Sequence, residues 1–326
     1  YARFRYWLAI QDLAICYFHI NRRIYLIQYT MEKKISHGEI GFIGLGIMGK
    51  PMILNLLKSG YKVRFFARRK SVVNTVLKKG GIHCSSISNL ASVCKIIFLN
   101  LTDDKAINEV IFGRNNIFEN IQQKSILIDM STISPSTSLE IAHKLKSIKS
   151  YILDCPVSGG EIGAIKGDLS IMVGGDEKIY KKIKPLLSCL GSNITYVGKS
   201  GSGQIAKACN QILVAQTIIA VSEILLLAKK TNTDPVLVQK ALMGGFAYSK
   251  ILDVHGTRII NGQYNPGFKS KLHLKDLNIA TNLCKANGLT LNGAKYSQKI
   301  LKKVVKANYG DKDSSIMSKI LENLIK

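Results

Sequence analysis

Short apolar runs alternate with segments of helical periodicity through the first 200 residues. The runs have the length of buried strands and lie at residues 39–43, 61–67, 95–101, 125–130, 151–154, 169–174 and 194–197. The segments between them repeat apolar residues at helical spacing and cover residues 48–58, 71–79, a stretch from 104 and a stretch from 135. Strands that alternate with helices predict an α/β domain with a doubly wound parallel sheet, which we place at residues 38–199.

The pattern changes at about residue 200. Residues 201–230 form one helical pattern that is apolar on nearly every face, as in a helix buried in protein or in membrane. Gln211, Gln216 and Glu223 lie inside this run and argue against a membrane. We therefore expect an all-α second domain, residues 200–326, built on this long central helix. Its other helices are expected at residues 234–243, 247–260, 292–307 and 313–326, with one more that starts near Lys275.

The first 37 residues differ from the rest because they contain neither Gly nor Pro and hold the single tryptophan, Trp7. The first methionine is Met31. We expect the fold to start close to Met31 and residues 1–37 to be an extension outside it. The apolar run at residues 7–20 is too short to span a bilayer and does not have the pattern of a secretory signal, although a membrane or organelle anchor stays open as an alternative.

Three glycines follow the first strand in the spacing G-x-G-x-x-G and open a helix. In a dinucleotide site of the Rossmann type, Gly44 permits the tight turn, Gly46 lets the backbone approach the pyrophosphate and Gly49 lets the helix pack on the strand. The positive end of the helix then faces the anion. A glycine-rich turn without a ligand is the alternative, but the flanking strand and helix favour a dinucleotide. The candidate contacts are Gly44, Leu45, Gly46, Ile47, Met48 and Gly49.

The second strand ends in Ala67, Arg68 and Arg69. An NAD site usually has Asp or Glu here, about 20 residues past the glycines, to bind the ribose 2′-hydroxyl. Since no carboxylate is present to repel a 2′-phosphate, and an arginine can bind one bidentately, the sequence favours NADP over NAD, with NAD possible. The alternative is that both arginines are simply exposed.

Polar residues follow the next two strands, where a doubly wound sheet binds its ligands. Residues 100–103 and 129–132 are expected near the nicotinamide end. The candidates there are Asn100, Leu101, Asp103, Ser131 and Thr132. The hydroxyls could equally serve the turns themselves.

A further strand leads into Ser158, Gly159 and Gly160. Successive glycines expose backbone N–H groups, and together with the Ser158 hydroxyl these suit a small carboxylate. A purely structural loop would also use glycine, so the pattern by itself leaves both readings open.

Lys207 and Asn210 stand three residues apart near the start of the long helix and therefore share one face. A partly buried lysine at the positive end of a helix has its charged form disfavoured, which would suit it to give and take a proton. A lysine whose head simply reaches solvent is the alternative.

Composition narrows the choice of partners. The formal charge of +25 comes mostly from lysines spread along expected helices, without a nucleic-acid-binding motif, so we expect a solvated surface that attracts an anionic cofactor and substrate and binds no nucleic acid. The seven cysteines are scattered without a C-x-x-C pair and the histidines lack ligand spacing. We expect no disulfide framework, no metal and a reducing, cytoplasmic setting.

Five segments in one order resemble the β-hydroxyacid dehydrogenase family, a group related to 6-phosphogluconate dehydrogenase. The resemblance runs from about residue 40 to the C-terminus. The segments are GFIGLGIMGKPM at 41–52, DMSTISP at 129–135, DCPVSGGEIGAIKGDLSIMVGGDE at 154–177, GQIAKACNQ at 203–211 and FKSKLHLKDLNIA at 268–280. The segment FLNLTDD at 98–104 departs from the more usual M-L-P pattern of the family, which weakens the three cofactor candidates there.

The resemblance implies a role for each matching residue. Lys207 matches the catalytic lysine, while Thr132 and Lys275 match cofactor contacts. The positions that hold substrate or orient the lysine are matched by Ser131, Ser158, Gly159, Gly160 and Asn210.

The resemblance also implies an activity and an assembly. The segment at 154–177 and the stretch ALMGGFAYSKILDVHGTRIINGQYNPGF at 241–268 are most similar to reductases of 2-hydroxy-3-oxopropionate (tartronate semialdehyde), which form glycerate. The alternatives among enzymes are 3-hydroxyisobutyrate dehydrogenase and another short-chain semialdehyde reductase. Outside enzymes, the alternatives are a non-catalytic dinucleotide-binding protein and a basic nucleic-acid-binding protein that kept a dinucleotide fold. The family further implies a homodimer or homotetramer with the long helix at the interface, and no membrane partner.

Overall fold

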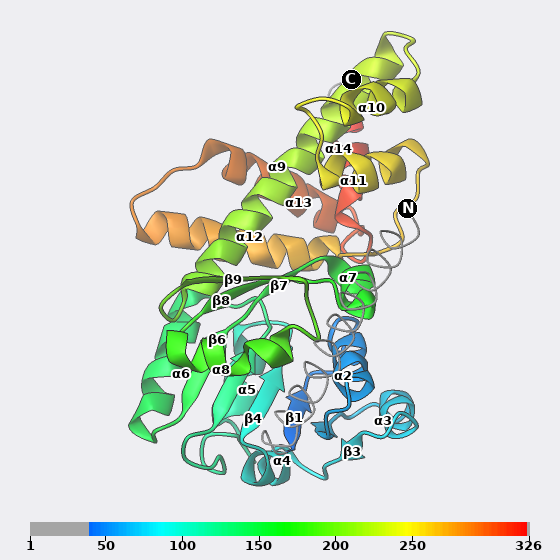
Figure 1. The fold of residues 1–326 in the computed structure, drawn as a ribbon. Coiled ribbons are helices and arrows are strands. Elements are labelled where there is room, and N and C mark those ends of the chain that lie inside the picture. Colours follow the sequence, from blue (N-terminus) through cyan, green and yellow to red (C-terminus); the bar gives the residue numbers. More distant parts are fainter. Residues whose placement is uncertain (1–38, 325–326) are drawn as a thin grey trace, which may run out of the picture.

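The computed structural model describes residues 39–324 (Figure 1). The expected extension, residues 1–37, lies outside the described residues. Within residues 39–324 the chain forms an α/β unit and, above it in Figure 1, a unit made of helices. The long helix α9 (Ser202–Lys230) starts at the sheet and runs through the helical unit.

The first six strands form the parallel part of one sheet. They are β1 (Ile40–Ile43), β2 (Val63–Phe66), β3 (Ile82–His83), β4 (Ile96–Leu99), β5 (Ile126–Asp129) and β6 (Tyr151–Asp154). Their order in space is β3-β2-β1-β4-β5-β6, so the chain changes direction across the sheet between β1 and β4. A doubly wound sheet binds ligands outside the carboxyl ends of its strands at this point.

The remaining strands make the sheet mixed. β8 (Ser170–Gly174) runs antiparallel to β6 and to β7 (Val157–Ser158), and β9 (Asn193–Gly198) runs parallel to β8. The expected parallel sheet is therefore correct for β1 to β6 and wrong for β8. Two parallel neighbouring strands need a crossover connection, usually a helix. The chain instead passes from β6 through the short strand β7 before it reaches β8, and β8 runs antiparallel.

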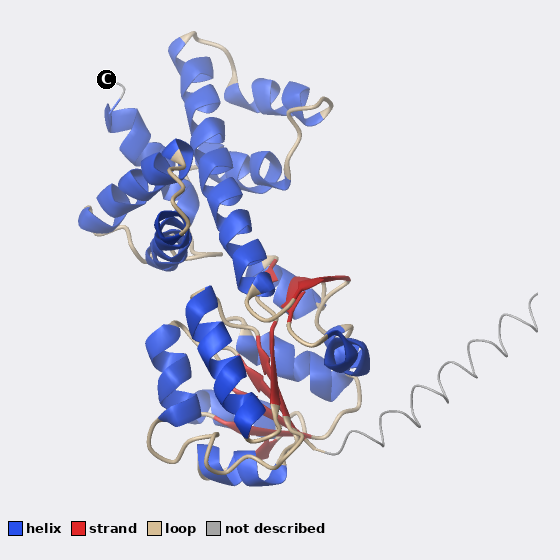
Figure 2. Cartoon of the chain, turned by 90° about the vertical axis from the view of Figure 1, so that its left-hand side faces the viewer, coloured by secondary structure: helices blue, strands red, loops and turns tan. Residues whose placement is uncertain are grey.

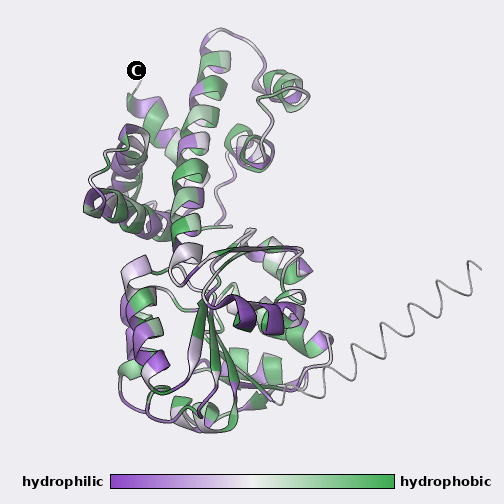
Figure 3. Ribbon diagram, turned by 60° about the vertical axis from the view of Figure 1, so that its left-hand side comes forward, coloured by the Kyte–Doolittle hydropathy of each residue, from purple (hydrophilic) through white to green (hydrophobic). Residues whose placement is uncertain are grey.

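Both faces of the sheet carry a core beneath helices (Figures 2 and 3). Alternate residues of a strand point to opposite faces: Phe42 of β1 stacks on Phe98 of β4 on one side, while Ile43 and Leu99 join the core on the other. The helices of this unit are α2 (Gly49–Lys58), α3 (Lys70–Leu77), α4 (Ile87–Val93), α5 (Asp104–Phe112), α6 (Pro135–Ser147), α7 (Gly160–Lys166) and α8 (Glu177–Leu187).

The second unit packs its helices around α9. They are α10 (Pro235–Met243), α11 (Lys250–Ile260), α12 (Ser270–Ala286), α13 (Asn292–Lys306), the 3-10 helix η1 (Ser314–Ile316) and α14 (Met317–Leu324). The expected start of α12 near Lys275 is wrong, because the N–H groups of Ser270 and Lys271 bond to the carbonyls of Lys312 and Gly310 and hold the first turn earlier.

Among residues 39–324, α9 is the helix with the length and apolarity of a membrane span. It packs against α11, α12, α13 and α14, and these contacts account for most of its buried apolar positions. Leu213 and Leu227 on α9 nevertheless stay 68% and 63% exposed. Within the described chain, the apolar surface of this helix is therefore only partly covered.

The start of α9 is capped by a residue distant in sequence. The cap position is Gly201, which has no side chain to accept a hydrogen bond. Instead, the Asp154 carboxylate at the end of β6 accepts the N–H groups of Gly201 at 2.9 Å and Gln204 at 3.0 Å. Burial raises the pKa of Asp154 to about 6, and these backbone bonds oppose the shift, so the group is ionised at neutral pH.

The first turn of α9 also touches the sheet directly. A Cβ on Gly203 would lie 2.5 Å from the carbonyl oxygen of Asp154 and 2.6 Å from that of Met172. The side chain of Gln204 donates to the Ser131 carbonyl at 2.9 Å and accepts the Ile133 N–H at 3.2 Å. These contacts determine the direction in which α9 leaves the sheet.

The contact at Gly203 predicts an effect on stability. Gly203→Ala places a methyl against two backbone oxygens that cannot move aside, and we expect the free energy of unfolding to fall by about 2–3 kcal/mol despite the better helix propensity of alanine. Urea denaturation measures the change. Gly163→Ala in α7 is the matched control, since its nearest neighbour is a leucine methyl 3.3 Å away, and a change there as large as that for Gly203→Ala would contradict the prediction.

Candidate functional site

Each glycine of the G-x-G-x-x-G turn meets a different constraint. Gly44 has φ +98°, and a Cβ there would lie 2.2 Å from the carbonyl oxygen of Asn100. A Cβ on Gly49 would lie 2.0 Å from the Gly44 carbonyl oxygen, so the helix can pack this closely only with glycine. Nothing lies within 4 Å of a Cβ on Gly46. That open space, at the start of α2, fits the close approach of a pyrophosphate.

The residues around the turn suit a dinucleotide in other respects. Ile47 is exposed and Met48, the cap residue of α2, makes no capping bond with its side chain. The first turn of α2 contains no acidic residue. An anion at this helix terminus therefore meets N–H groups and no repelling carboxylate.

The two arginines after β2 lie at the edge of this turn. Arg69 donates from its Nη2 to the Leu45 carbonyl at 3.2 Å, which ties the end of β2 to the glycine turn. Arg68 is exposed and makes no hydrogen bond or ion pair within residues 39–324. The guanidinium of Arg68 is thus available to a phosphate, and that of Arg69 stands next to the cofactor turn.

The loop after β4 passes over the glycine turn. The Asn100 N–H bonds to the carbonyl of Ile43 at 3.0 Å, and the Leu101 N–H bonds to the Ser131 hydroxyl at 2.8 Å. Asp103 caps α5 by accepting the Ala106 N–H at 2.8 Å. The structure therefore places Asn100 beside the turn, joins Leu101 to Ser131 and gives Asp103 a structural task. The contact of all three with a cofactor stays a prediction.

Lys275 links the two units at this edge. From α12 its Nζ donates to the carbonyls of Thr102 at 2.8 Å and Thr132 at 2.5 Å, and it lies 3.0 Å from the Asp276 carboxylate. Lys275 and Thr132, both predicted to contact the cofactor, are thus brought together. Ser131 is buried, and its hydroxyl accepts the N–H of Leu101.

The amine of Lys207 is buried beside Val157, directly before the loop Ser158 to Gly160, which we call the substrate loop after its predicted role. The residue is 7% exposed, and its Nζ donates to the carbonyl of Val157 at 2.8 Å. Burial lowers the pKa of Lys207 to about 8; the carboxylate of Asp276 opposes this shift and the charge of Lys275 adds to it. A lysine with such a pKa can donate and accept a proton near neutral pH.

The Ser158 to Gly160 loop follows that carbonyl directly. Gly159 and Gly160 have φ of +129° and +63°, which side chains rarely adopt, and Gly159 is the cap residue of α7. Within residues 39–324 the Ser158 hydroxyl makes no hydrogen bond, so it can bind a ligand. A Cβ on Gly160 would lie 3.9 Å from the carbonyl oxygen of Gly267, in the helical unit.

Asn210 does not contact the lysine amine in this structure. Its amide donates to Gln211 Oε1 at 2.8 Å, and Gln211 donates in turn to Asp276 at 2.6 Å. The amine of Lys207 donates to the Val157 carbonyl. The predicted role of Asn210 in positioning the lysine is therefore untested by these contacts.

Sequence reasoning missed several residues of the site. A backbone carbonyl such as that of Val157 carries no signal in the residue type. Gln204, Gln211 and Asp276 could have been found, because buried polar residues in an apolar helix or beside a predicted cofactor lysine need partners. Among residues 39–324 no group of three His, Cys, Asp or Glu side chains could hold a metal ion.

Two family models match consecutive parts of the chain between residues 39 and 321. The NAD binding domain of 6-phosphogluconate dehydrogenase matches residues 39–198, and the NAD-binding domain of NADP-dependent 3-hydroxyisobutyrate dehydrogenase matches residues 201–321. Both models describe nicotinamide dinucleotide enzymes, in agreement with the glycine turn.

Whole-chain relatives agree with these models. The chain is 43% identical to 2-hydroxy-3-oxopropionate reductase of Escherichia coli, over 87% of its own length and 97% of the relative, and 33% identical to mitochondrial 3-hydroxyisobutyrate dehydrogenase of Rattus norvegicus, over 86% of each. The solved structure of Mycobacterium tuberculosis 3-hydroxyisobutyrate dehydrogenase with L-serine has a TM-score of 0.80 and 28% identity, and covers 87% of this chain and 99% of that one. The family indicated by the five segments is thereby confirmed: the chain belongs to the 3-hydroxyisobutyrate dehydrogenase-related family of NAD(P)-dependent hydroxyacid dehydrogenases.

Proposed function

We propose that this enzyme prefers NADPH and reduces 2-hydroxy-3-oxopropionate (tartronate semialdehyde) to glycerate. The observation that carries the proposal is the buried amine of Lys207, which donates to the Val157 carbonyl directly before the Ser158 to Gly160 loop. The choice of substrate is supported by the reductase of Escherichia coli at 43% identity.

Each residue of the site has a separate role in such a reduction. The glycine turn would hold the pyrophosphate of a reduced dinucleotide, whose nicotinamide would supply the hydride. Lys207 gives a proton to the carbonyl oxygen as the carbon gains the hydride, so that the product is an alcohol and the lysine is left neutral. Ser158 and the N–H groups of the glycine loop hold the substrate carboxylate beside it. Lys275 keeps the helical unit against the two loops at the nicotinamide end.

A second candidate function has its own support. The chain is also 33% identical to the 3-hydroxyisobutyrate dehydrogenase of Rattus norvegicus, and the same lysine could remove a proton during oxidation of that hydroxyacid. Assays with tartronate semialdehyde and methylmalonate semialdehyde, each with NADPH and NADH, decide between the two. A kcat/KM higher for methylmalonate semialdehyde would favour the second function.

Exposed apolar residues support self-association. They lie on α9, on α10 and in the loop that follows α10, and include Leu213, Leu227, Leu237 and the fully exposed Phe246. Large apolar side chains that one chain leaves exposed are often buried where two copies meet. As part of the proposal, the enzyme is a homodimer or homotetramer that buries these side chains.

Replacement of Lys207 should affect turnover and stability in opposite directions. In Lys207→Met we expect turnover to fall by about 10²–10⁴-fold, because the proton donor is lost, while the Kd for NADPH changes little. The free energy of unfolding should rise by about 1–3 kcal/mol, since a lysine with a lowered pKa costs stability. Steady-state kinetics, NADPH titration and urea denaturation measure the three effects. The exposed Lys199→Met is the control, and normal turnover in Lys207→Met would refute the role of this lysine.

The lowered pKa of Lys207 also predicts opposite pH profiles for the two directions. Reduction needs the protonated amine, so its kcat should fall as the pH rises through about 8. Oxidation needs the neutral amine, so its kcat should rise over the same range. Rates measured from pH 6 to 10 in both directions test this, and two parallel profiles would contradict it.

The exposed guanidinium of Arg68 predicts the cofactor preference. Because a charge-assisted bond to phosphate contributes about 1.5–3 kcal/mol, Arg68→Ala should raise the KM for NADPH by roughly 10- to 100-fold and leave the KM for NADH unchanged. Ala67→Asp should shift the kcat/KM ratio toward NADH by adding the missing carboxylate. Equal effects on both cofactors would show that Arg68 does not bind the 2′-phosphate.

A further inference from the structure

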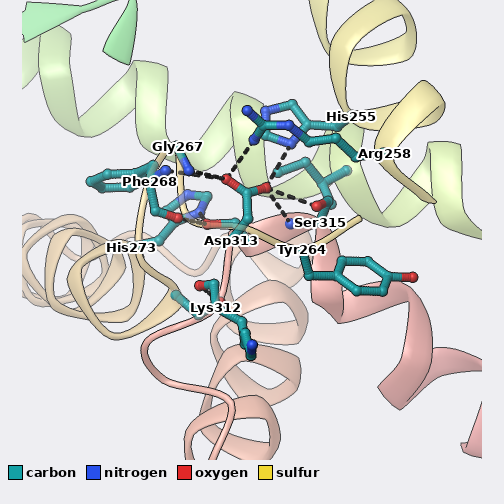
Figure 4. A network of polar contacts seen from close by, with 12 residues as sticks. His255, Arg258, Tyr264, Gly267, Phe268, His273, Lys312, Asp313 and Ser315 are labelled. Atoms are coloured by element: carbon teal, nitrogen blue, oxygen red, sulfur yellow. Dashed lines mark hydrogen bonds and ion pairs between the residues drawn. The ribbon is translucent and has the colours of Figure 1, made fainter. Parts of the chain in front are cut away.

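A buried carboxylate far from Lys207 in sequence gathers donors from several segments of the helical unit (Figure 4). Asp313 is fully buried. Its Oδ2 accepts Nη1 of Arg258 at 2.6 Å and the backbone N–H groups of Gly267 and Phe268, each at 3.1 Å. One oxygen atom thus joins helix α11 to the loop that precedes α12.

The other oxygen of Asp313 is also occupied. Oδ1 accepts the Ser315 N–H at 3.1 Å and its hydroxyl at 2.8 Å, and lies 3.3 Å from Nδ1 of His255. Burial would raise the pKa of Asp313, but the neighbouring imidazole of His255 and the bonds from Ser315 outweigh burial and lower it well below the usual range. These partners therefore favour the charged form of the carboxylate.

The backbone on either side reinforces the same junction. The N–H of Asp313 bonds to the carbonyl of Tyr264 at 3.1 Å, and the N–H of Ser314 bonds to that of Phe268 at 3.2 Å. In the opposite direction, Ser270 donates its N–H to the carbonyl of Lys312 at 2.8 Å. Residues 264–270 are thus held along residues 312–314.

This junction leads to the substrate loop. The carbonyl oxygen of Gly267, whose N–H Asp313 binds, is the nearest atom to a Cβ built on Gly160, at 3.9 Å. The guanidinium of Arg258 packs on the other side of Gly267, since a Cβ there would lie 2.8 Å from Nη2. The position of Gly267 relative to Gly160 therefore depends on groups that Asp313 holds.

A second connection leads to the helix that carries the lysine. His273 pairs with the Ser314 hydroxyl at 3.0 Å through Nδ1 and with the carbonyl of Gln211 at 3.2 Å through Nε2. Burial lowers the pKa of His273 to about 4, so the ring is neutral, and its proton lies on Nε2 because a carbonyl can only accept. Gln211 is one turn beyond Lys207 on α9.

We propose that Asp313 is a positioning residue for the dehydrogenase reaction. Its carboxylate holds the loop at Gly267 and Phe268 next to the Ser158 to Gly160 loop. The helical unit then contributes a fixed wall to the site where the oxo acid binds. The inference rests on the proposed substrate position at Ser158 to Gly160. It does not depend on which hydroxyacid is the substrate.

The charge and both oxygens are needed for this task. In Asp313→Asn the amide has one acceptor oxygen left for donors that come from His255, Arg258, Ser315 and two backbone N–H groups, and its own NH₂ faces donors. The loop then loses its anchor although the volume of the side chain is kept. Since displacement of a substrate-positioning group by about 1 Å can cost about 100-fold, the effect should appear in substrate binding and turnover.

The experiment compares substrate and cofactor binding in the full-length enzyme, with the best oxo acid from the semialdehyde assays. We expect Asp313→Asn to raise the KM of the oxo acid at least about tenfold and to leave the Kd for NADPH within about twofold. Arg258→Met should also raise the KM of the oxo acid, by a smaller factor, and leave the Kd for NADPH unchanged. In Arg258→Lys the KM of the oxo acid should lie between those of Arg258→Met and the wild-type enzyme. Ser249→Ala is the matched control, because it removes the cap bond to Leu252 at the start of the same helix α11 without touching the loop.

The outcomes separate this inference from the proposed function. An inactive wild-type enzyme on every oxo acid would overturn the proposed function. An active wild-type enzyme whose oxo acid KM is unchanged in folded Asp313→Asn would overturn the positioning role alone. An equal loss of NADPH binding, or the same KM change in Ser249→Ala, would also overturn it by showing general damage. If Asp313→Asn does not fold, an unchanged KM in Arg258→Met decides against the inference.

Discussion

The bond between the Asp154 carboxylate and the first turn of α9 is the contact on which the site depends. It joins the last parallel strand to the helix that organises the second unit. Lys207 lies one turn beyond Gln204, so the direction of that first turn determines where the amine points. The partner of the amine is the carbonyl of Val157, three residues past Asp154 itself. One short segment after β6 therefore both caps the helix and receives its lysine.

Burial gives the site its chemistry at a cost in stability. Lys207 is enclosed between the sheet and the helical unit, and the resulting loss of hydration lowers its pKa to about 8. Lys275 and Asp276 lie close enough to act on that pKa in opposite directions. The junction of two units can hold such charges because strands, loops and helices all supply backbone groups there, as the bonds of Lys275 to Thr102 and Thr132 show.

Most of the fold could be read from local patterns, and the errors have identifiable causes. The strands β3 and β7 contain two residues each, too few for an apolar run, and neither was expected. The reversed direction of β8 depends on how the chain returns after β6, which periodicity does not encode. The start of α12 was misplaced because backbone bonds to Lys312 and Gly310, about 40 residues away, hold its first turn.

The sequence by itself determined the glycine turn, the alternation of strands and helices and the presence of a lysine on an apolar helix, because each is a local pattern. The tertiary structure decided the partners. The amide of Asn210 bonds to Gln211 on the same helix, while the amine of Lys207 donates to the Val157 carbonyl, 50 residues away. Nothing in the sequence around Asp313 indicated that its carboxylate would bind the loop at Gly267. Contacts at such separations arise only when packing brings distant segments together, so no spacing along the chain could have shown them.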